Sequence, residues 1–319
     1  MIKFGTGGWR AIIGEEFTKE NIQKLALAMS LKIKAEHVED KPVVIGYDRR
    51  FLSKEAVIWS CEIFGQQGIK VLFVDRSSPT PLIMFYVMKH DLSYGMMVTA
   101  SHNPAIYNGI KVFTNGGRDA DEHQTADIER YLEQADKLYV PDLEENEQMP
   151  PHAYQELVKS GRVVEMNPMN EYLDNIISLI NLDAIRERDL RIAIDPMYGV
   201  SLTALCTILS IARCTVETIN AQHDTLFGGK MPAPTESTLR NLQNYVLDRY
   251  CDIGIATDGD ADRLGVIDDK GHYLHANTIL VMLYYYLLKY KGWRGAAVRN
   301  IATTHLLDRV AKAFGQECI

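Results

Sequence analysis

The chain has 319 residues, of which 46% are hydrophobic and 24% are charged, and its formal net charge is −8. This composition is ordinary for a globular protein of two or three domains, and it excludes disordered, collagen-like and membrane-bundle classes. General nucleic-acid binding needs a basic surface, so neither a nucleic acid nor a membrane is expected as a partner.

The first half of the chain alternates predicted helices with apolar strands. Thr18 caps a helix whose apolar residues recur at helical spacing between Ile22 and Ile33. Strands are predicted at residues 42–47, 69–74, 94–100 and 109–113, and further helices begin near Ser53, Pro81 and Asp121. Gly68 is predicted to end the second helix. The acidic, proline-flanked residues 140–151 are interpreted as a surface excursion near the end of a first domain.

The second half repeats this alternation. Strands are predicted at residues 191–195, 215–219, 252–257 and 296–301, and a hairpin turn at 268–271. Helices are predicted from Ser201, from Glu236, from Asn277 to residue 291, and from Thr303 or Thr304. Apolar strands that alternate with amphipathic helices predict an α/β fold with parallel sheets covered on both faces.

Cysteine usage and the N-terminus indicate a reduced, cytoplasmic setting. The five cysteines show no CxxC spacing and their number is odd, so neither a disulfide framework nor a structural zinc site is expected. They are Cys61, Cys206, Cys214, Cys251 and Cys318. No signal peptide is recognised at the start of the chain.

Three aspartates occupy every second position after the predicted strand 252–257, namely Asp258, Asp260 and Asp262. In an extended or tightly looped backbone this spacing turns all three carboxylates the same way, where they repel unless a cation lies among them. Carboxylate oxygens favour Mg²⁺ or Ca²⁺ over soft metals. An ordinary acidic loop is the alternative. An EF-hand is excluded because its sixth position is Arg263 rather than glycine and its twelfth is Asp269 rather than glutamate.

Residues 99–104 (TASHNP) follow another apolar strand. Ligand sites of parallel sheets form beyond the carboxyl ends of strands, which makes Ser101 and His102 candidate site residues. An ordinary polar turn fits the same pattern. Lys111 either faces solvent or lies beside Ser101 across a hairpin, where a lowered pKa would let it move protons.

Residues 4–10 (FGTGGWR) form a third candidate motif. Its glycines allow close approach of an anion to the backbone, and Arg10 could hold that anion by two hydrogen bonds. The motif is neither GxGxxG nor a P-loop, and by itself it fits a flexible terminus equally well.

These three motifs in this order resemble signatures of the α-D-phosphohexomutase family, which includes phosphoglucomutases and phosphomannomutases. The resemblance extends along essentially the whole chain, including DPMYGV and VRNIATTHLLD. It implies an α/β fold of tandem related α/β/α domains with mixed, mostly parallel sheets. The implied domains are residues 1–160 with the phosphoserine, 161–272 with the metal-binding loop, and 273–319 as part of a third.

The resemblance also implies an isomerase that moves a phosphoryl group between the 1- and 6-positions of a hexose phosphate through a bisphosphate intermediate. Ser101 would be the phosphoserine. Asp258, Asp260 and Asp262 would hold Mg²⁺, with an oxygen of the Ser101 phosphate completing the site. The implied partner is a small-molecule sugar phosphate, with a hexose 1,6-bisphosphate as activator.

Five further roles follow from the resemblance or accompany it. Arg10 and Arg263 would contact phosphate, and Lys111 and His102 would assist proton transfer. His305 is the candidate ligand contact in the third unit, although a capping role fits it as well.

Family members continue with a sugar-recognition loop and a fourth, phosphate-binding domain, for which we find no match in these residues. We therefore expect a C-terminally truncated member with little or no turnover on its own. Two alternatives stay open: a metal- or sugar-phosphate-binding fragment without turnover, and an aspartyl phosphatase of the haloacid-dehalogenase type with Asp258 as nucleophile.

Overall fold

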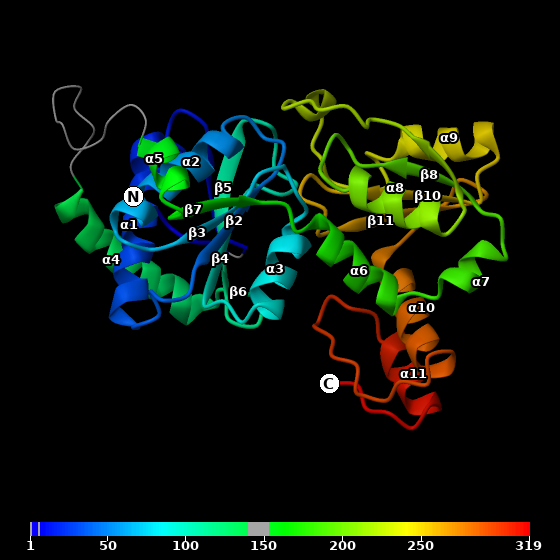
Figure 1. Ribbon diagram of the computed structural model, residues 1–319. Coiled ribbons are helices and arrows are strands. Elements are labelled where there is room, and N and C mark those ends of the chain that lie inside the picture. The colour runs from blue at the N-terminus through cyan, green and yellow to red at the C-terminus, as the bar shows by residue number, and fades with distance from the viewer. Residues whose placement is uncertain (1, 6, 140–152) are drawn as a thin grey trace.

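The computed structural model of the protein describes residues 2–5, 7–139 and 153–319. The excursion predicted at residues 140–151 lies outside the described residues. Two α/β units, each built on one mixed sheet, stand side by side and are followed by a helical C-terminal segment (Figure 1). We call these the first unit (residues 2–166), the second unit (169–274) and the C-terminal segment (276–319). The predicted α/β class with tandem α/β/α units is confirmed.

The first unit is centred on a seven-stranded sheet in the order β1-β5-β4-β2-β3-β7, with β6 pairing to β5. Strands β4, β2, β3 and β7 are parallel, whereas β5 runs antiparallel to β4, β1 and β6. The strands are β1 (Trp9–Ile12), β2 (Val43–Tyr47), β3 (Val71–Val74), β4 (Tyr94–Val98), β5 (Tyr107–Thr114), β6 (Arg118–Asp119) and β7 (Val163–Met166). The first domain was expected to end at residue 160. Strand β7, which follows that residue, pairs with β3 and therefore belongs to the first sheet.

Helices cover both faces of this sheet. One face packs against α1 (Lys19–Ala35), α2 (Ser53–Gln66), α4 (Glu122–Leu138) and α5 (Ala153–Lys159), and the other against α3 (Thr80–Lys89). Thr18 accepts the N–H of Asn21 and caps α1, as predicted. The apolar face predicted between Ile22 and Ile33 is fully buried. Gly68 follows the end of α2 with φ +81°, a left-handed conformation that glycine adopts without strain.

The second unit repeats the arrangement on a five-stranded sheet in the order β12-β11-β10-β8-β9. Strand β10 lies between parallel β8 and antiparallel β11, as β4 lies between β2 and β5. The strands are β8 (Arg191–Asp195), β9 (Thr215–Thr218), β10 (Ile253–Thr257), β11 (Leu264–Asp268) and β12 (Tyr273–Leu274). The helices are α6 (Met169–Leu179), α7 (Leu182–Arg186), α8 (Leu202–Ile211), the 3₁₀ turn η1 (Phe227–Gly229) and α9 (Arg240–Arg249). Helix α9 begins later than the predicted Glu236, because Thr235 and Thr238 first close a turn.

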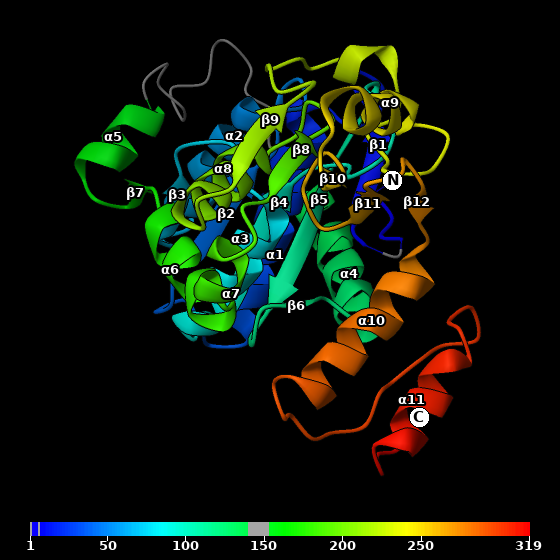
Figure 2. The same cartoon turned by 90° about the vertical axis from the view of Figure 1, so that its right-hand side faces the viewer.

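The C-terminal segment contains α10 (Ala276–Lys289) and α11 (Leu306–Ala313), which lie to one side of both sheets (Figures 1 and 2). Helix α10 is capped by His275, whose side chain accepts the N–H of Asn277, so the helix begins at Ala276 and Asn277 lies inside it rather than at its cap. The strand predicted at 296–301 is not formed. In the part of the chain that the structure describes, the β-pairing of these residues is a single bridge between Ala297 and Cys318. No helix within the described ranges is long and apolar enough to cross a membrane.

Gly109 on β5 generates a prediction about the first sheet. A Cβ at this position would lie 2.1 Å from the Trp9 carbonyl oxygen of β1 and 3.0 Å from that of Thr99. We expect Gly109→Ala to lower the free energy of unfolding by about 1–3 kcal/mol, the usual cost of overpacking. Urea denaturation measures this difference in the free energy of unfolding. Gly161→Ala is the control. A Cβ there meets nothing within 4 Å, so that substitution reports only the cost of placing alanine at a φ of +72°. Equal stability of Gly109→Ala and the wild type would contradict the prediction.

Candidate functional site

Two loops, one from each unit, meet at the carboxyl ends of β4 and β10. The hydroxyl of Ser101, on the loop after β4, donates a hydrogen bond of 2.9 Å to Oδ2 of Asp258, on the loop after β10. Gly259 makes this approach possible, since a Cβ there would lie 2.8 Å from the carbonyl oxygen of Ser101. The predicted phosphoserine and the predicted metal loop are therefore in direct contact.

Ser101 itself is buried and has a left-handed backbone, with φ +51°. Its Oγ lies 3.2 Å from Nδ1 of His102. Burial, and next the positive charge of Arg263, lower the pKa of His102. A neutral imidazole at this distance can exchange a proton with the serine hydroxyl.

The acidic loop is compact enough to hold one cation. Oxygen atoms of Asp258, Asp260 and Asp262 lie within 4.8 Å of one another. Asp258 and Asp260 are fully buried, whereas Asp262 reaches the surface. Burial and then the charges of the other two carboxylates raise the pKa of Asp258. Oδ1 of Asp260 is buried without any hydrogen-bond partner, so this donor set fits a hard divalent cation such as Mg²⁺.

Lys111 is the buried positive charge of the site. It lies on β5 opposite Met97, and its Nζ donates to Oδ2 of Asp260 at 2.9 Å and to Oδ2 of Asp262 at 2.6 Å. Burial by itself would lower the pKa of Lys111, but the two carboxylates outweigh it and the pKa is raised. The lowered pKa that a proton-transfer role requires is thus not found here. Lys111 is an ammonium group in this arrangement.

Two arginines complete the positive charge around Ser101. Arg10, from β1, donates through Nη1 to Oδ1 of Asn103 at 2.7 Å, which fixes the guanidinium beside the Ser101 loop. Arg263 is half exposed, with Nε 3.9 Å from Asp258. Both line a cavity of about 820 Å³ together with Ser101, Lys111 and the beginning of α4. The cavity is large enough for a sugar phosphate.

Among the predicted site residues, His305 is the one that neither lines this cavity nor contacts another predicted site residue. It precedes α11 in the C-terminal segment, where Nδ1 lies 3.0 Å from Asp308 and 2.9 Å from Arg299. These local contacts account for it as part of a surface ion-pair group.

Thr80 is a site residue that sequence reasoning missed. At the beginning of α3 its hydroxyl donates to Oδ2 of Asp260 at 2.7 Å, and its N–H donates to the Asp260 carbonyl at 2.9 Å. The signal available in the sequence is the run SSPTP after β3, since serine, threonine and proline cluster where a helix begins.

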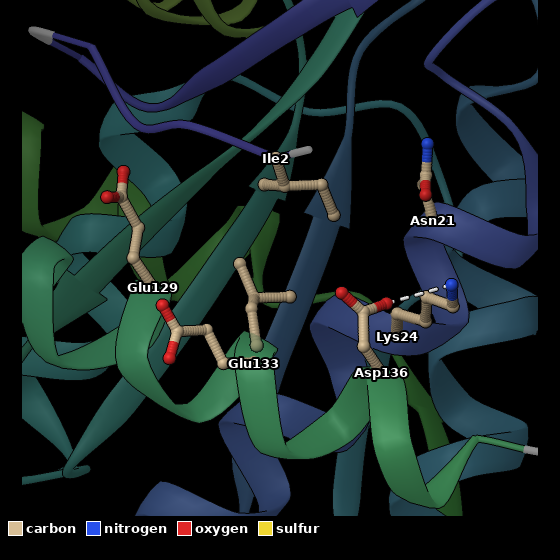
Figure 3. A pocket seen from close by; sticks show the side chains of 7 residues that line it. Ile2, Asn21, Lys24, Glu129, Glu133 and Asp136 are labelled. Carbon is tan, nitrogen blue, oxygen red and sulfur yellow. Dashed lines mark ion pairs between the residues drawn. The ribbon is translucent and has the colours of Figure 1, made fainter.

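A second hollow, of about 320 Å³, lies between α1 and α4 (Figure 3). Three acidic side chains of α4 surround it: Glu129, Glu133 and Asp136. Lys24 of α1 forms 2.8 Å ion pairs with Asp136 and with Glu20. This group joins two helices, and nothing in it indicates a ligand.

Comparison with known proteins gives concordant similarities. Family models described as phosphoglucomutase/phosphomannomutase α/β/α domain I and domain II match residues 1–139 and 170–271. A phosphoglucomutase/phosphomannomutase of Thermococcus kodakarensis is 30% identical over 98% of this chain and 65% of its own length. A protein of Pyrococcus abyssi described as a probable phosphoglucosamine mutase is 31% identical over 99% and 64%.

Solved structures agree with this. A Thermus thermophilus structure described as a putative phosphomannomutase superposes with a TM-score of 0.86 at 28% identity, over 99% of this chain and 68% of that one. The chain spans about 65% of the length of the curated relatives it matches.

The raised pKa of Asp258 generates a prediction about pH and cations. The folded protein binds this proton more tightly than the unfolded chain, whose aspartate pKa is 3.8, so without cation the stability should fall as the pH rises from 5 toward about 8. A divalent cation competes with the proton and should raise the melting temperature more at pH 8 than at pH 6. Thermal melts in EDTA and in Mg²⁺ or Mn²⁺ measure both effects.

Two variants control this experiment. Asp258→Asn removes the titrating group and should flatten the pH dependence and remove the cation effect. Asp269→Asn, at an exposed aspartate on the turn at the other end of β11, should behave like the wild type. Equal stabilisation of Asp258→Asn and the wild type by Mg²⁺ would show that the cation binds elsewhere.

Proposed function

This chain belongs to the phosphoglucomutase/phosphomannomutase family, and we propose that its residues perform phosphohexomutase chemistry centred on Ser101. The reaction transfers a phosphoryl group between the 1- and 6-positions of a hexose phosphate through a phosphoserine and a bisphosphate intermediate. The observation that carries the proposal is the 2.9 Å contact between the Ser101 hydroxyl and the acidic loop of the other unit. It joins the serine hydroxyl to the acidic loop beside a cavity that Ser101, Asp262 and three cationic side chains line.

His102 is the proton carrier in this proposal. When phosphorylated Ser101 reacts, the bond between Oγ and phosphorus breaks while a sugar hydroxyl oxygen bonds to phosphorus. The hydroxyl proton passes to Nδ1 of His102 and from there to Oγ of Ser101, which closes the proton balance. In the return step the bisphosphate has turned, its other phosphoryl group bonds to Ser101, and the serine proton moves the opposite way.

Charge neutralisation supplies most of the remaining catalysis, because phosphoryl transfer depends on positioning and electrostatics. Arg10 and Arg263 flank Ser101 and would bind phosphoryl oxygens. The three aspartates of the acidic loop would hold Mg²⁺, which supplies positive charge to those oxygens when bound. Lys111 keeps the acidic loop in place through its two ion pairs.

The proposed substrate class is a hexose or hexosamine phosphate, in line with the names of the relatives, and a hexose 1,6-bisphosphate would load Ser101. The aspartyl phosphatase alternative is less consistent with the site. Its nucleophile, Asp258, is buried and already accepts hydrogen bonds from Ser101 and from the N–H groups of Asp262 and Arg263. It also leaves Ser101 without a role.

Incubation with glucose 1,6-bisphosphate and Mg²⁺ tests the nucleophile. We expect one acid-stable phosphate on the peptide that contains Ser101, detected by intact mass and peptide mapping, because this hydroxyl faces both the cation site and the cavity. Ser101→Ala should take up none, while Ser77→Ala, which changes a serine outside the cavity lining, should be labelled normally. An acid-labile phosphate on Asp258, or labelling that persists in Ser101→Ala, would refute the assignment.

Net turnover by residues 1–319 alone is expected to be small. Of the described residues that line the cavity, the cationic ones are Arg10, Lys111 and Arg263, and the proposal uses all three at Ser101 or at the acidic loop. Without a clamp for the second phosphate we expect kcat/KM to fall on the order of 100-fold below a curated relative assayed alongside. A coupled assay for glucose 1-phosphate conversion measures it. Comparable rates would show that these residues suffice.

A further inference from the structure

Arg50 is a buried arginine that the proposed chemistry does not use. It follows β2, its side chain has no exposed surface, and its guanidinium donates to four main-chain carbonyls of the loop after β4. Nη2 donates to Ser101 and Asn103 at 2.7 Å each. Nη1 donates to Pro104 at 3.0 Å and to Tyr107 at 2.9 Å. One side chain therefore binds four carbonyls between Ser101 and Tyr107.

Asp48 orients this arginine and connects it to Ser101 by a second route. Its Oδ1 accepts the N–H of Arg50 at 2.9 Å and the hydroxyl of Ser53 at 3.0 Å. Its Oδ2 lies 3.3 Å from Nε of Arg50 and accepts the Thr99 hydroxyl at 2.7 Å. Oγ1 of Thr99 in turn accepts the N–H of Ser101 at 2.8 Å. All of these groups are buried.

Both backbone polar groups of Ser101 are thus held: the N–H by Thr99 and the carbonyl by Arg50. This matters because a φ of +51° is sterically unfavourable for a residue other than glycine. Such a conformation persists only where the surroundings determine it. Released from these bonds, Ser101 would relax to a negative φ, and its Oγ would turn away from Asp258.

We propose that Asp48, Arg50 and Thr99 form a positioning group, here called the Ser101 clamp, that aims the serine hydroxyl at the acidic loop for phosphoryl transfer. The inference rests on the proposed function of Ser101. The second unit closes over the clamp, since the Arg50 guanidinium lies 4.8 Å from the ring of Phe227. None of the three residues lines the cavity, so they act through Ser101 and not on the sugar phosphate.

Thr99 offers a matched pair of variants. Thr99→Val keeps the shape but can neither accept the Ser101 N–H nor donate to Asp48, whereas Thr99→Ser keeps both bonds. We expect the valine variant to lower the single-turnover rate of Ser101 phosphorylation about 10-fold, the equivalent of one lost buried hydrogen bond. The bisphosphate concentration for half-maximal rate should not change, because Arg10, Lys111 and Arg263 remain. The serine variant should restore the rate.

Arg50→Lys provides a readout that does not depend on the reaction. A lysine cannot donate to four carbonyls, so hydrogen–deuterium exchange of the peptide covering residues 99–108 should quicken about 10-fold. Exchange in β2 and α1 should stay as in the wild type. Arg76→Lys, at an exposed arginine on the same unit, is the control. If Arg50→Lys does not fold, the same exchange measurement on the Thr99 pair decides.

The outcomes separate the clamp from the proposed function. Unchanged exchange of residues 99–108 in these variants would overturn the clamp, and so would faster exchange spread evenly over the first sheet, which indicates general destabilisation. An unchanged rate in Thr99→Val would overturn it as well. If wild-type Ser101 takes up no phosphate, the proposed function fails, and the exchange data still decide whether the clamp holds the loop.

Discussion

The buried carboxylates of Asp258 and Asp260 need positive charge close by, and most of the site is arranged to supply it. Their ammonium partner, Lys111, belongs to the other sheet and reaches across the junction to Asp260. Buried carboxylates without such a partner would be strongly destabilising. Because the opposite charges come from different units, the ion pairs tie the second unit to the first at the same place where the Ser101 hydroxyl meets Asp258. The same contacts therefore dock the two units and assemble the site.

Local features of the fold could be predicted from the sequence, because they depend on residues that are neighbours in the chain. The cap at Thr18, the buried face of α1 and the end of α2 before Gly68 all depend on spacing within one or two turns of helix. The same holds for the strands that carry the two motifs. That their loops converge was implied by the family resemblance, in which the Ser101 phosphate completes the metal site, and the structure places Ser101 against Asp258.

What could not be predicted depends on partners distant in sequence. The sequence around Lys111 does not reveal its two carboxylate partners, which lie 149 and 151 residues further along the chain. These carboxylates decide the direction of the Lys111 pKa shift. Thr80 begins a helix and Arg50 follows a strand, and only the folded chain shows what their side chains bind. Residues 296–301 have the composition of a strand, but a strand also needs neighbours for its backbone groups, and within the described ranges their β-pairing is one bridge, between Ala297 and Cys318.

The position shared by β4 and β10 has a consequence for how this chemistry could arise. Each strand lies between a parallel and an antiparallel neighbour of its own sheet, and each carries one half of the site on the loop that follows it. The corresponding loop position is thus used twice, once for Ser101, the proposed nucleophile, and once for the acidic loop proposed to bind a cation, and the two loops contact each other. In the proposed function, two units of the same architecture therefore need no additional scaffold. The same loop position carries a different chemical group in each unit, and the reaction takes place where the two units meet.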